Sequence, residues 1–529
     1  IAYLSRLAGI TAGALTTEPE AVSAAAMEQL LHPNPDDWPT YYGRYDGNRH
    51  TALNQITPAN VGTLQTQWIY SLPYVGLETT PLVIDGVMYV SGPNQVYALD
   101  ARTGREIWAW QRPRTAAGVI AGDAAKGAQR GVAALGDRIF FITDNAHMVA
   151  LHRLTGAPLW DVYMPEEAQH YGGTSAPLVV GDLVIGGLAG ADSGIRGFVA
   201  AYKATTGKLA WRHWTVPRIG EPGFDTWKGK AVDLGGGSTW LTGTFDPVLK
   251  LLYWPTGNPY PDTDGTDREG DNLYTNCILA LDPKTGERRW HFQFTPHDVH
   301  DWDATEPPVL VDARFRGRDR KLLLHADRNG FFYVLDRTNG EFLLAEPFVK
   351  KITWASGIDA QGRPKLLPGN QPTRQGTKTC PDVRGATNWY SPAYNPATRL
   401  FYVMTVEDCS VYRQAANGGF IRIPDPDDPG KKHLRALDME TGKIVWEIEQ
   451  IGHPETNYSG VLSTATGLVF YGESGGAFAA VDAKTGTTLW HFEASQPWKA
   501  SPITYMVKGR QYIAIASGAN ILSFALPGK

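Results

Sequence analysis

The stretch VYALDARTGREIW, residues 96–108, reads as a strand, a tight turn and a second strand that closes on tryptophan. Apolar residues alternate with other residues on both sides of the turn, which is typical of half-buried strands. The Thr-Gly pair fits the turn, because glycine accepts the positive φ of a tight hairpin and Asp and Thr side chains bond nearby backbone. The stretch therefore predicts a β-hairpin.

The same pattern recurs along the whole chain. The fifth of the seven copies ends on Leu344 instead of tryptophan, and an eighth closing tryptophan, Trp68 in TLQTQWIYSL, has no turn before it. Such self-similarity indicates a repeat architecture. The other six copies are MVALHRLTGAPLW (148–160), VAAYKATTGKLAW (199–211), ILALDPKTGERRW (278–290), FYVLDRTNGEFLL (332–344), LRALDMETGKIVW (434–446) and FAAVDAKTGTTLW (478–490).

Further strand-like runs lie between the copies, such as TPLVIDGVMYVSG (80–92) and VLSTATGLVFYG (461–472). Each unit then offers about four antiparallel strands in roughly 45–80 residues, the size of a propeller blade with insertions. Eight closures predict an all-β fold, a single eight-bladed β-propeller of four-stranded antiparallel blades. The strand of Trp68 needs partners, and QYIAIASGANILSFAL (511–526) supplies them, so N- and C-terminal strands would close the ring. A pair of β-sandwiches is the alternative, but sandwiches do not repeat one motif seven times.

Composition limits the partners and the domain organisation. The 529 residues carry a net charge of −5, which disfavours nucleic acid as a partner, and no apolar run reaches the ~18 residues of a membrane span. Residues 1–35 differ from the rest, and EPEAVSAAAMEQLL (18–31) predicts a short helix within an N-terminal arm. We expect residues 36–529 to form one propeller domain.

Three cysteines are present. Cys277 lies in the apolar run NCILALD, which indicates a small buried side chain. Cys380 and Cys409 bracket a polar stretch and could pair. A disulfide between them would imply an oxidising compartment.

The loop PHDVHDWDATEPP, residues 296–308, concentrates four acids and two histidines. Its composition alone leaves three interpretations open: a solvated acidic loop, a metal site, or a catalytic carboxylate beside a metal.

The repeat LDxxTGxxxW and the loops around it resemble the pyrroloquinoline quinone (PQQ) dehydrogenases of the methanol and ethanol type, over about residues 36–527. The resemblance implies a propeller that oxidises a primary alcohol to an aldehyde with PQQ and one metal ion. The family carries a loop of the form P-H-D-x-W-D-Y, and here His300 and Trp302 replace its two aromatic residues. Asp301 therefore falls on the family's catalytic aspartate, which acts as general base and also approaches the metal.

The resemblance also implies a set of metal ligands. Asp303 stands where the family has a carboxylate in members that use a lanthanide and a small uncharged residue in members that use calcium; its alternative is a helix cap or surface acid. Asn258 in PTGNPYP matches a ligating asparagine, and Asp192 in LAGADSGIRG stands where the family has glutamate. Hard cations prefer such oxygen ligands. Three carboxylates, Asp192, Asp301 and Asp303, favour a lanthanide over Ca²⁺.

Other loops match the residues that hold the quinone. Trp240 in GGGSTW matches the tryptophan beneath the quinone ring, although a core residue is its alternative. Arg328 in HADRNGFFYVLD matches the basic residue that bonds the reactive carbonyl and stabilises negative charge there, and an ordinary strand-end arginine is its alternative. The remaining matches to residues that contact the cofactor or line its site are Glu78, Arg130, Thr174, Gly190, Ala191 and Asn388.

Several features depart from the family or extend it. Many members place adjacent cysteines over the cofactor, where this chain has Ala124 and Ala125. No CxxCH haem motif is present, so we expect no haem in this chain and electron transfer to a soluble acceptor such as a cytochrome c. Cys380 and Cys409 match a family disulfide, which implies a periplasmic location. The oligomeric state is not encoded in any motif.

Three alternatives to the alcohol dehydrogenase remain. A sugar or polyol dehydrogenase would use the same cofactor, although the methanol- and ethanol-like loops disfavour it. A non-catalytic scaffold propeller would have no reason to keep Asp301, Asn258, Arg328 and Trp240 together. A member that has lost activity is suggested by the missing cysteines and by Asp192.

Overall fold

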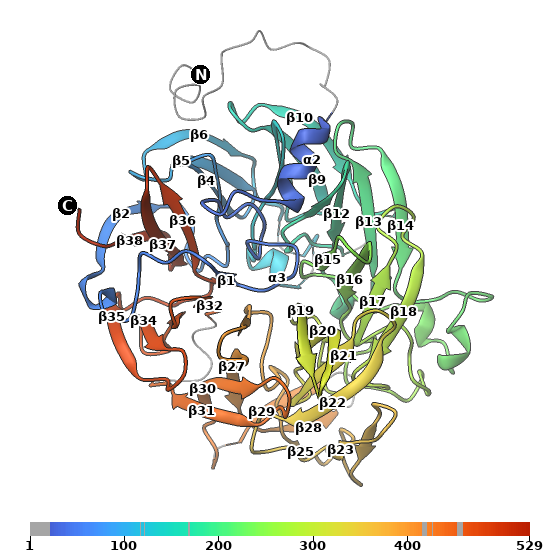
Figure 1. Ribbon diagram of the computed structural model, residues 1–529. Helices are drawn as coiled ribbons and strands as arrows, with labels where there is room; N and C mark the ends of the chain where they lie inside the picture. The colour runs from blue at the N-terminus through green and yellow to red at the C-terminus, as the bar shows by residue number, and fades with distance from the viewer. Residues whose placement is uncertain are drawn as a thin grey trace.

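A computed structural model describes residues 22–116, 118–120, 122–167, 170–414, 420–425, 427–451 and 459–528. Its strands form consecutive, mostly antiparallel sheets that follow one another around a common centre (Figure 1). The all-β prediction is therefore confirmed. No helix in these ranges is long and apolar enough to cross a membrane. The helices among them are α2 (Ala24–Leu31), α3 (Gly122–Ala125) and the 3₁₀ helices η1 (Val61–Thr63), η2 (Ala191–Ser193), η3 (Phe224–Thr226) and η4 (Ala231–Asp233).

Five sheets are each built from four strands that are consecutive in the chain. They are β3 (Leu82–Ile84), β4 (Val87–Gly92), β5 (Gln95–Asp100) and β6 (Glu106–Gln111); β7 (Ala133–Leu135), β8 (Arg138–Ile142), β9 (His147–His152) and β10 (Pro158–Tyr163); β11 (Leu178–Val180), β12 (Leu183–Gly187), β13 (Phe198–Lys203) and β14 (Leu209–Trp214); β15 (Thr244–Asp246), β16 (Leu251–Pro255), β17 (Cys277–Leu281) and β18 (Arg288–Gln293); and β19 (Val309–Phe315), β20 (Arg318–Ala326), β21 (Phe331–Asp336) and β22 (Glu341–Pro347).

The other sheets include strands that are distant in sequence. One contains β26 (Ala393–Asn395), β27 (Leu400–Glu407), β30 (Lys431–Asp438) and β31 (Ile444–Glu449); another β1 (His50–Thr51), β32 (Val461–Thr464), β33 (Leu468–Gly472), β34 (Ala477–Asp482) and β35 (Thr488–Glu493); and another β2 (Gln65–Ser71), β36 (Ile503–Val507), β37 (Arg510–Ser517) and β38 (Asn520–Ala525). Two small insertions hold β23 (Ala355–Ile358) with β24 (Pro364–Leu366), and β25 (Thr377–Thr379) with β28 (Ser410–Gln414) and β29 (Phe420–Pro424).

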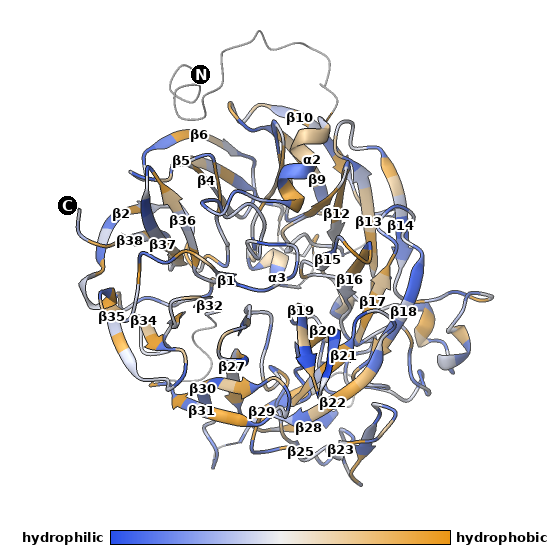
Figure 2. Cartoon of the chain, viewed as in Figure 1, coloured by the Kyte–Doolittle hydropathy of each residue, from blue (hydrophilic) through white to orange (hydrophobic). Residues whose placement is uncertain are grey.

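Each copy of the repeat forms the last two strands of a sheet, and its turn joins them at the periphery (Figure 1). The middle strands are buried along their length, as in β8, because neighbouring sheets cover both faces. The last strands alternate, as in β35, because one face meets solvent. Figure 2 shows this mixture of apolar and polar residues along the peripheral strands.

The closing tryptophan of one sheet packs onto the turn glycine of the next. A Cβ on Gly156 would lie 2.6 Å from the ring of Trp108, so only glycine leaves room for the indole. The indole nitrogen of Trp108 also donates to the carbonyl of Arg153, at 2.9 Å. Where the fifth copy lacks tryptophan, Leu344 and Glu346 face the turn glycine Gly442 instead. The tryptophan–glycine pairs are Trp68 with Gly104, Trp108 with Gly156, Trp160 with Gly207, Trp211 with Gly286, Trp290 with Gly340 and Trp446 with Gly486.

The two ends of the chain meet in one sheet. Strand β2 pairs antiparallel with β38, and Trp68 lies opposite Ser523. The predicted pairing of the Trp68 strand with the C-terminal strands is therefore present. Before it, α2 forms the predicted short helix, which contacts β7, and Leu30 is buried in the same core cluster as Ala133 and Leu135 of that strand. The rest of the predicted N-terminal arm, residues 1–21, lies outside the described residues.

The disulfide and the buried cysteine are also as predicted. Cys380 and Cys409 are bonded, with their Cα atoms 4.4 Å apart, and the bond links the ends of the paired strands β25 and β28. Cys277 is a free, fully buried side chain in β17.

Candidate active site

The position of the site follows from the order of the strands in each sheet. In a four-stranded antiparallel sheet, the segment that enters the first strand and the loop between the second and third strands lie at the same end. Trp240 precedes β15 and Asp301 precedes β19, while Asp192 lies between β12 and β13, and Arg328 lies between β20 and β21. Sheets arranged around one centre therefore bring these loops together.

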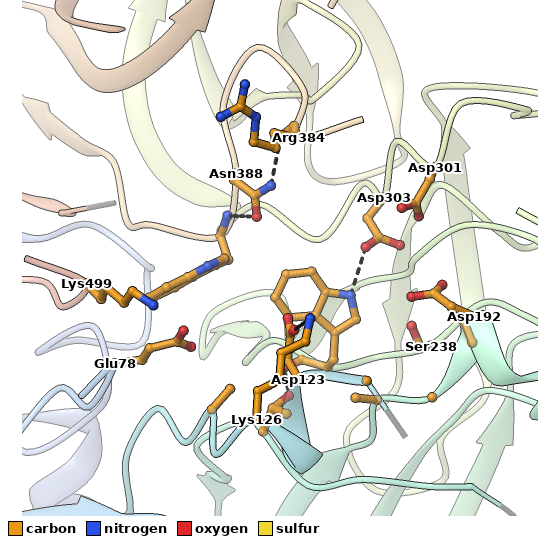
Figure 3. A pocket seen from close by; sticks show the side chains of 18 of the residues that line it. Glu78, Asp123, Lys126, Asp192, Ser238, Asp301, Asp303, Arg384, Asn388 and Lys499 are labelled. Atoms are coloured by element: carbon orange, nitrogen blue, oxygen red, sulfur yellow. Dashed lines mark hydrogen bonds and ion pairs between the residues drawn. The ribbon is translucent and has the colours of Figure 1, made fainter. Parts of the chain in front are cut away.

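These loops surround a cavity of about 570 Å³ (Figure 3). Arg130 and Asn258 do not line it but contact residues that do. The predicted residues on its wall are Glu78, Thr174, Gly190, Ala191, Asp192, Trp240, Asp301, Asp303, Arg328 and Asn388. In Figure 3 the carboxylates of Asp192, Asp301 and Asp303 lie on one side of the cavity, and Glu78 lies on the other.

Three carboxylates form the acidic side of the cavity. Enclosure by protein and the neighbouring charge of Asp303 raise the pKa of Asp192 to about 7. Burial and the charges of Asp192 and Asp303 raise the pKa of Asp301 well above its usual value. Desolvation and like charge both disfavour the ionised form. On this side of the cavity, the neighbouring positive charge of Arg328 therefore does not offset the negative charge of all three acids.

Asp303 is the most firmly held of the three. It is 6% exposed. Its Oδ1 accepts from the backbone N–H of Asn258 at 2.7 Å, and its Oδ2 accepts from the indole nitrogen of Trp240 at 3.0 Å. A side chain on Gly257 would collide with this carboxylate, because its Cβ would lie 2.1 Å from Oδ1. The side-chain nitrogen of Asn258 also donates to Asp192 at 3.2 Å, which ties the two acidic loops together.

Arg328 connects the acidic loop 296–308 to the loop that contains Asn388. Its guanidinium lies 3.1 Å from Asp303 and donates to the carbonyl of Asp301 at 3.1 Å and to the side chain of Asn388 at 3.4 Å. Burial alone would lower its pKa, but the carboxylates of Asp303 and Glu306 raise it, so the guanidinium is charged. The site thus contains a fixed cation beside the acids.

The opposite side of the cavity is built around Arg130. Its guanidinium lies 2.8 Å from the Glu78 carboxylate and packs over the rings of Trp240 and Trp389, at 4.9 Å and 4.4 Å. Thr174 donates to the carbonyl of Trp240 at 3.0 Å. Burial raises the pKa of Glu78, while Arg130 opposes this shift.

Glu306 belongs to a second buried cluster, and no specific role was predicted for it. Its carboxylate lies 3.3 Å from Arg328 and 3.8 Å from His325, which lies 3.2 Å from Asp327. Among the described residues, this is the one group of three His, Cys, Asp or Glu side chains whose ligand atoms all lie within 4.8 Å. The carboxylates of Asp192, Asp301 and Asp303 are therefore spread more widely.

The loop 296–308 is not a solvated acidic loop, so that interpretation is wrong. Asp298 is 1% exposed and accepts from the backbone N–H groups of His300 and Trp302, at 2.9 Å and 2.8 Å. Its burial raises its pKa to about 6. The ring nitrogen Nε2 of buried His300 lies 2.8 Å from the carbonyl of Asn370. Asp298 and His300 thus stabilise the loop that presents Asp301.

Several wall residues were not predicted. Trp389 directly follows Asn388 in the chain, so the match at Asn388 is the signal that could have pointed to it. Ala124 and Ala125, which we matched to the family's cysteine pair, lie in α3, whose Asp123 faces the cavity. Lys499 sits in QPWKASP, which carries no motif. The unpredicted wall residues that matter below are Trp389, Asp123, Lys126, Arg384 and Lys499.

The residues present fit a metal ion and a planar anionic cofactor. Carboxylate and amide oxygens on the acidic side suit a hard cation, which would supply the missing positive charge. On the other side, Nη2 of Arg130 and Oε2 of Glu78 lie 2.8 Å apart, but Nε of Arg130 is buried without a hydrogen-bond partner. Buried polar atoms without partners point to a ligand that provides them. The volume is in the range of small-molecule sites.

Comparisons with known proteins point to one family. The PQQ family model described as "Glucose/ethanol/alcohol dehydrogenase, beta-propeller domain" matches residues 38–350 and 433–513. Quinohemoprotein alcohol dehydrogenase ADH IIB of Pseudomonas putida is 39% identical over 512 residues, 91% of this chain and 73% of that protein. Quinoprotein alcohol dehydrogenase PedH of Pseudomonas putida is 35% identical over 543 residues, 94% of this chain and 89% of that protein.

Solved structures give the same result. The quinohemoprotein alcohol dehydrogenase of Comamonas testosteroni superposes with a TM-score of 0.88 at 33% identity, covering 96% of this chain and 84% of that one. A europium-containing methanol dehydrogenase superposes with a TM-score of 0.85 at 31% identity, covering 94% of this chain and 100% of that one.

Proposed function

Because this chain belongs to the family of PQQ-dependent quinoprotein alcohol dehydrogenases, we propose that it oxidises primary alcohols to aldehydes with PQQ and one metal ion. The electrons then pass to a separate acceptor, such as a cytochrome c. The family relationship supports an alcohol as the substrate class.

One observation carries this proposal beyond the family relationship. Ten residues predicted from separate loops line a single cavity, with the acids on one side and Glu78 on the other. A scaffold propeller has no need for three mutually repelling carboxylates, and such an arrangement costs stability unless a cation offsets it. This separation supports a site that holds a metal at one end and an anionic cofactor at the other.

The residues of this chain have separate roles in the proposed reaction. Asp301 reaches the cavity from the acidic loop and takes the proton of the alcohol hydroxyl as general base. Arg328, fixed by Asp303 and Asn388, places positive charge where negative charge develops. Trp240 forms the floor, and Glu78, Arg130, Thr174 and the Gly190–Ala191 backbone hold the cofactor's edge. When bound, PQQ would accept the hydride, which carries both electrons removed from the alcohol, and the metal would act as a Lewis acid.

We propose that the metal is a lanthanide, held by Asp192, Asn258, Asp301 and Asp303. Three carboxylates balance a trivalent ion better than Ca²⁺, and selectivity between hard cations follows ligand charge and number. A relative of this chain is a europium-containing methanol dehydrogenase, which favours the same choice. Asp192, shorter than glutamate by one methylene, would bind directly if the ion shifts toward its loop, or through water.

We further propose that residues 36–529 form one domain, an eight-bladed ring closed between β2 and β38, after an N-terminal arm of residues 1–35. The pairing of β2 with β38 and the run of four-stranded sheets support this closure. The disulfide Cys380–Cys409 supports a periplasmic location, because disulfides persist in oxidising compartments.

Reconstitution tests the function. The apo-protein is loaded with PQQ and either La³⁺ or Ca²⁺ and assayed with an artificial electron acceptor against alcohols, glucose and polyols. We expect turnover of primary alcohols, faster with La³⁺. Equal or greater activity with Ca²⁺ would contradict the lanthanide assignment, and preference for glucose would support a sugar dehydrogenase, a substrate class also present in the family description.

A further inference from the structure

Carboxylates pair with almost every cation on the cavity wall. Lys126 lies 3.2 Å from Asp123, Arg328 lies 3.1 Å from Asp303, and Arg384 lies 3.0 Å from Asp382. Lys499 is the exception: within the described ranges, it forms no ion pair or hydrogen bond. The wall therefore holds one ammonium group whose charge is not offset by a close carboxylate.

Lys499 lies at the end of the cavity away from the acids. Figure 3 shows its side chain near Glu78 and across the cavity from Asp301 and Asp303. The charge of Lys499 also acts to lower the pKa of Glu78, which burial raises. Among the residues that the structure describes, the cation that forms an ion pair with Glu78 is Arg130, at 2.8 Å.

The position of Lys499 is defined by its neighbours. Trp498 before it is fully buried and packs against Phe478 at 5.5 Å. Lys499 itself is half-buried, and its Nζ lies over Gly76, where an added Cβ would come within 4.0 Å. An anchored, half-buried ammonium group loses less conformational entropy on binding than a free surface lysine does.

A cofactor that carries several carboxylates brings negative charge into a wall that already holds Glu78, Asp123 and the acidic side. Burying a carboxylate without a charged partner is costly. We propose that Lys499 binds a carboxylate of the quinone cofactor, at the end of the cavity opposite the metal. This contact would then raise the affinity of the protein for the cofactor. This inference rests on the proposed function, because it assumes that PQQ occupies the cavity.

The test measures PQQ binding directly. Quenching of tryptophan fluorescence reports the dissociation constant of PQQ for the intact protein with La³⁺ present, at low and at high NaCl. The variants are Lys499→Gln and Lys499→Arg, and Lys208→Gln is the matched control because it removes an exposed lysine that is not on the cavity wall. Circular dichroism shows whether each variant is folded.

We expect Lys499→Gln to raise the dissociation constant at least about tenfold, or about 1.4 kcal/mol, and to reduce its salt dependence. Lys499→Arg and Lys208→Gln should bind as the wild type does. Equal affinity and salt dependence in folded Lys499→Gln would overturn the inference. Failure of the wild type to bind PQQ would instead overturn the proposed function, so the two failures are distinguishable.

Discussion

Asp301 combines an uncommon backbone conformation with a charged side chain. Its φ is +62°, in the left-handed region that residues other than glycine seldom adopt. Such conformations persist where the surroundings impose them and cluster at active sites. Asp298 and Arg328 impose it here by binding the loop backbone at His300, Trp302 and the carbonyl of Asp301. The strain is therefore consistent with a residue positioned for chemistry.

Asp301→Asn tests the role of this carboxylate. Asparagine tolerates the left-handed region, so the change removes the base with little added backbone strain. We expect turnover of a primary alcohol by the PQQ- and La³⁺-loaded protein to fall at least about a hundredfold, the contribution of general base catalysis. Fluorescence titration checks that the variant still binds PQQ. Turnover close to that of the wild type would show that Asp301 is not the base.

Asp303 is poised to influence the choice of metal. Its carboxylate is buried and already accepts from Asn258, Trp240 and Arg328, yet a carboxylate offers about four acceptor positions. Removing it deletes one negative charge from the acidic side while Arg328 keeps Glu306 as a partner.

We therefore expect Asp303→Ala to lower the preference for La³⁺ over Ca²⁺, measured as the ratio of their dissociation constants, by at least about tenfold. Competition against Tb³⁺ luminescence gives both constants. Asp262→Asn, a change in a neighbouring acid that was not predicted to bind the metal, is the comparison. An unchanged ratio in Asp303→Ala would remove Asp303 from the metal site.

At the scale of elements, the contact between a closing tryptophan and the next turn explains the repeat. The glycine has two functions at once: Gly156 adopts a φ of +72°, and it leaves room for the ring of Trp108. The hairpin turn requires the positive φ, and the contact between sheets requires the space left by the missing side chain. Sequence periodicity alone revealed the hairpins, but the inter-sheet contact became clear only with the structure.

Gly156→Ala and Gly181→Ala separate these two functions. Gly181 also has a positive φ, +60°, but nothing lies within 4 Å of an added Cβ. We expect Gly181→Ala to cost about 1–2 kcal/mol of unfolding free energy from backbone strain alone. Gly156→Ala should cost a further 1–3 kcal/mol or so, because its methyl group overlaps the Trp108 ring. Urea unfolding measures both, and equal losses would mean that the indole contact contributes nothing.

The sequence predicted some parts of the molecule better than others, for physical reasons. Hairpins depend on neighbouring residues, so seven of them could be read from Thr-Gly and Asn-Gly turns. The burial of Asp298 could not be read, because it depends on backbone N–H groups that the loop itself supplies after folding. Lys499 and Glu306 carry no motif, and their importance arises only where separate loops meet. Long-range contacts of this kind leave no local pattern.

At the scale of the whole molecule, closure of the proposed ring depends on β2, which pairs with β38 and places Trp68 against Gly104 of the following sheet. Trp68 and Trp108 are a matched pair: each is 8% exposed and packs on the turn glycine of the following sheet. Their indole nitrogens donate to the carbonyls of Ala101 and Arg153, at 3.2 Å and 2.9 Å. Trp108 lies within a run of consecutive sheets, whereas Trp68 lies in the sheet that unites the two ends of the chain.

If the ring is closed and unfolds as one unit, both joints should be equally important. We expect Trp68→Ala and Trp108→Ala each to lower the unfolding free energy by about 3–5 kcal/mol, the usual cost of removing a buried tryptophan. Urea unfolding followed by circular dichroism and by fluorescence should give one coincident transition in both variants. A much smaller loss for Trp68→Ala, or separate transitions, would indicate that the sheet of β2 and β36–β38 opens independently and that the ring is not a single cooperative domain.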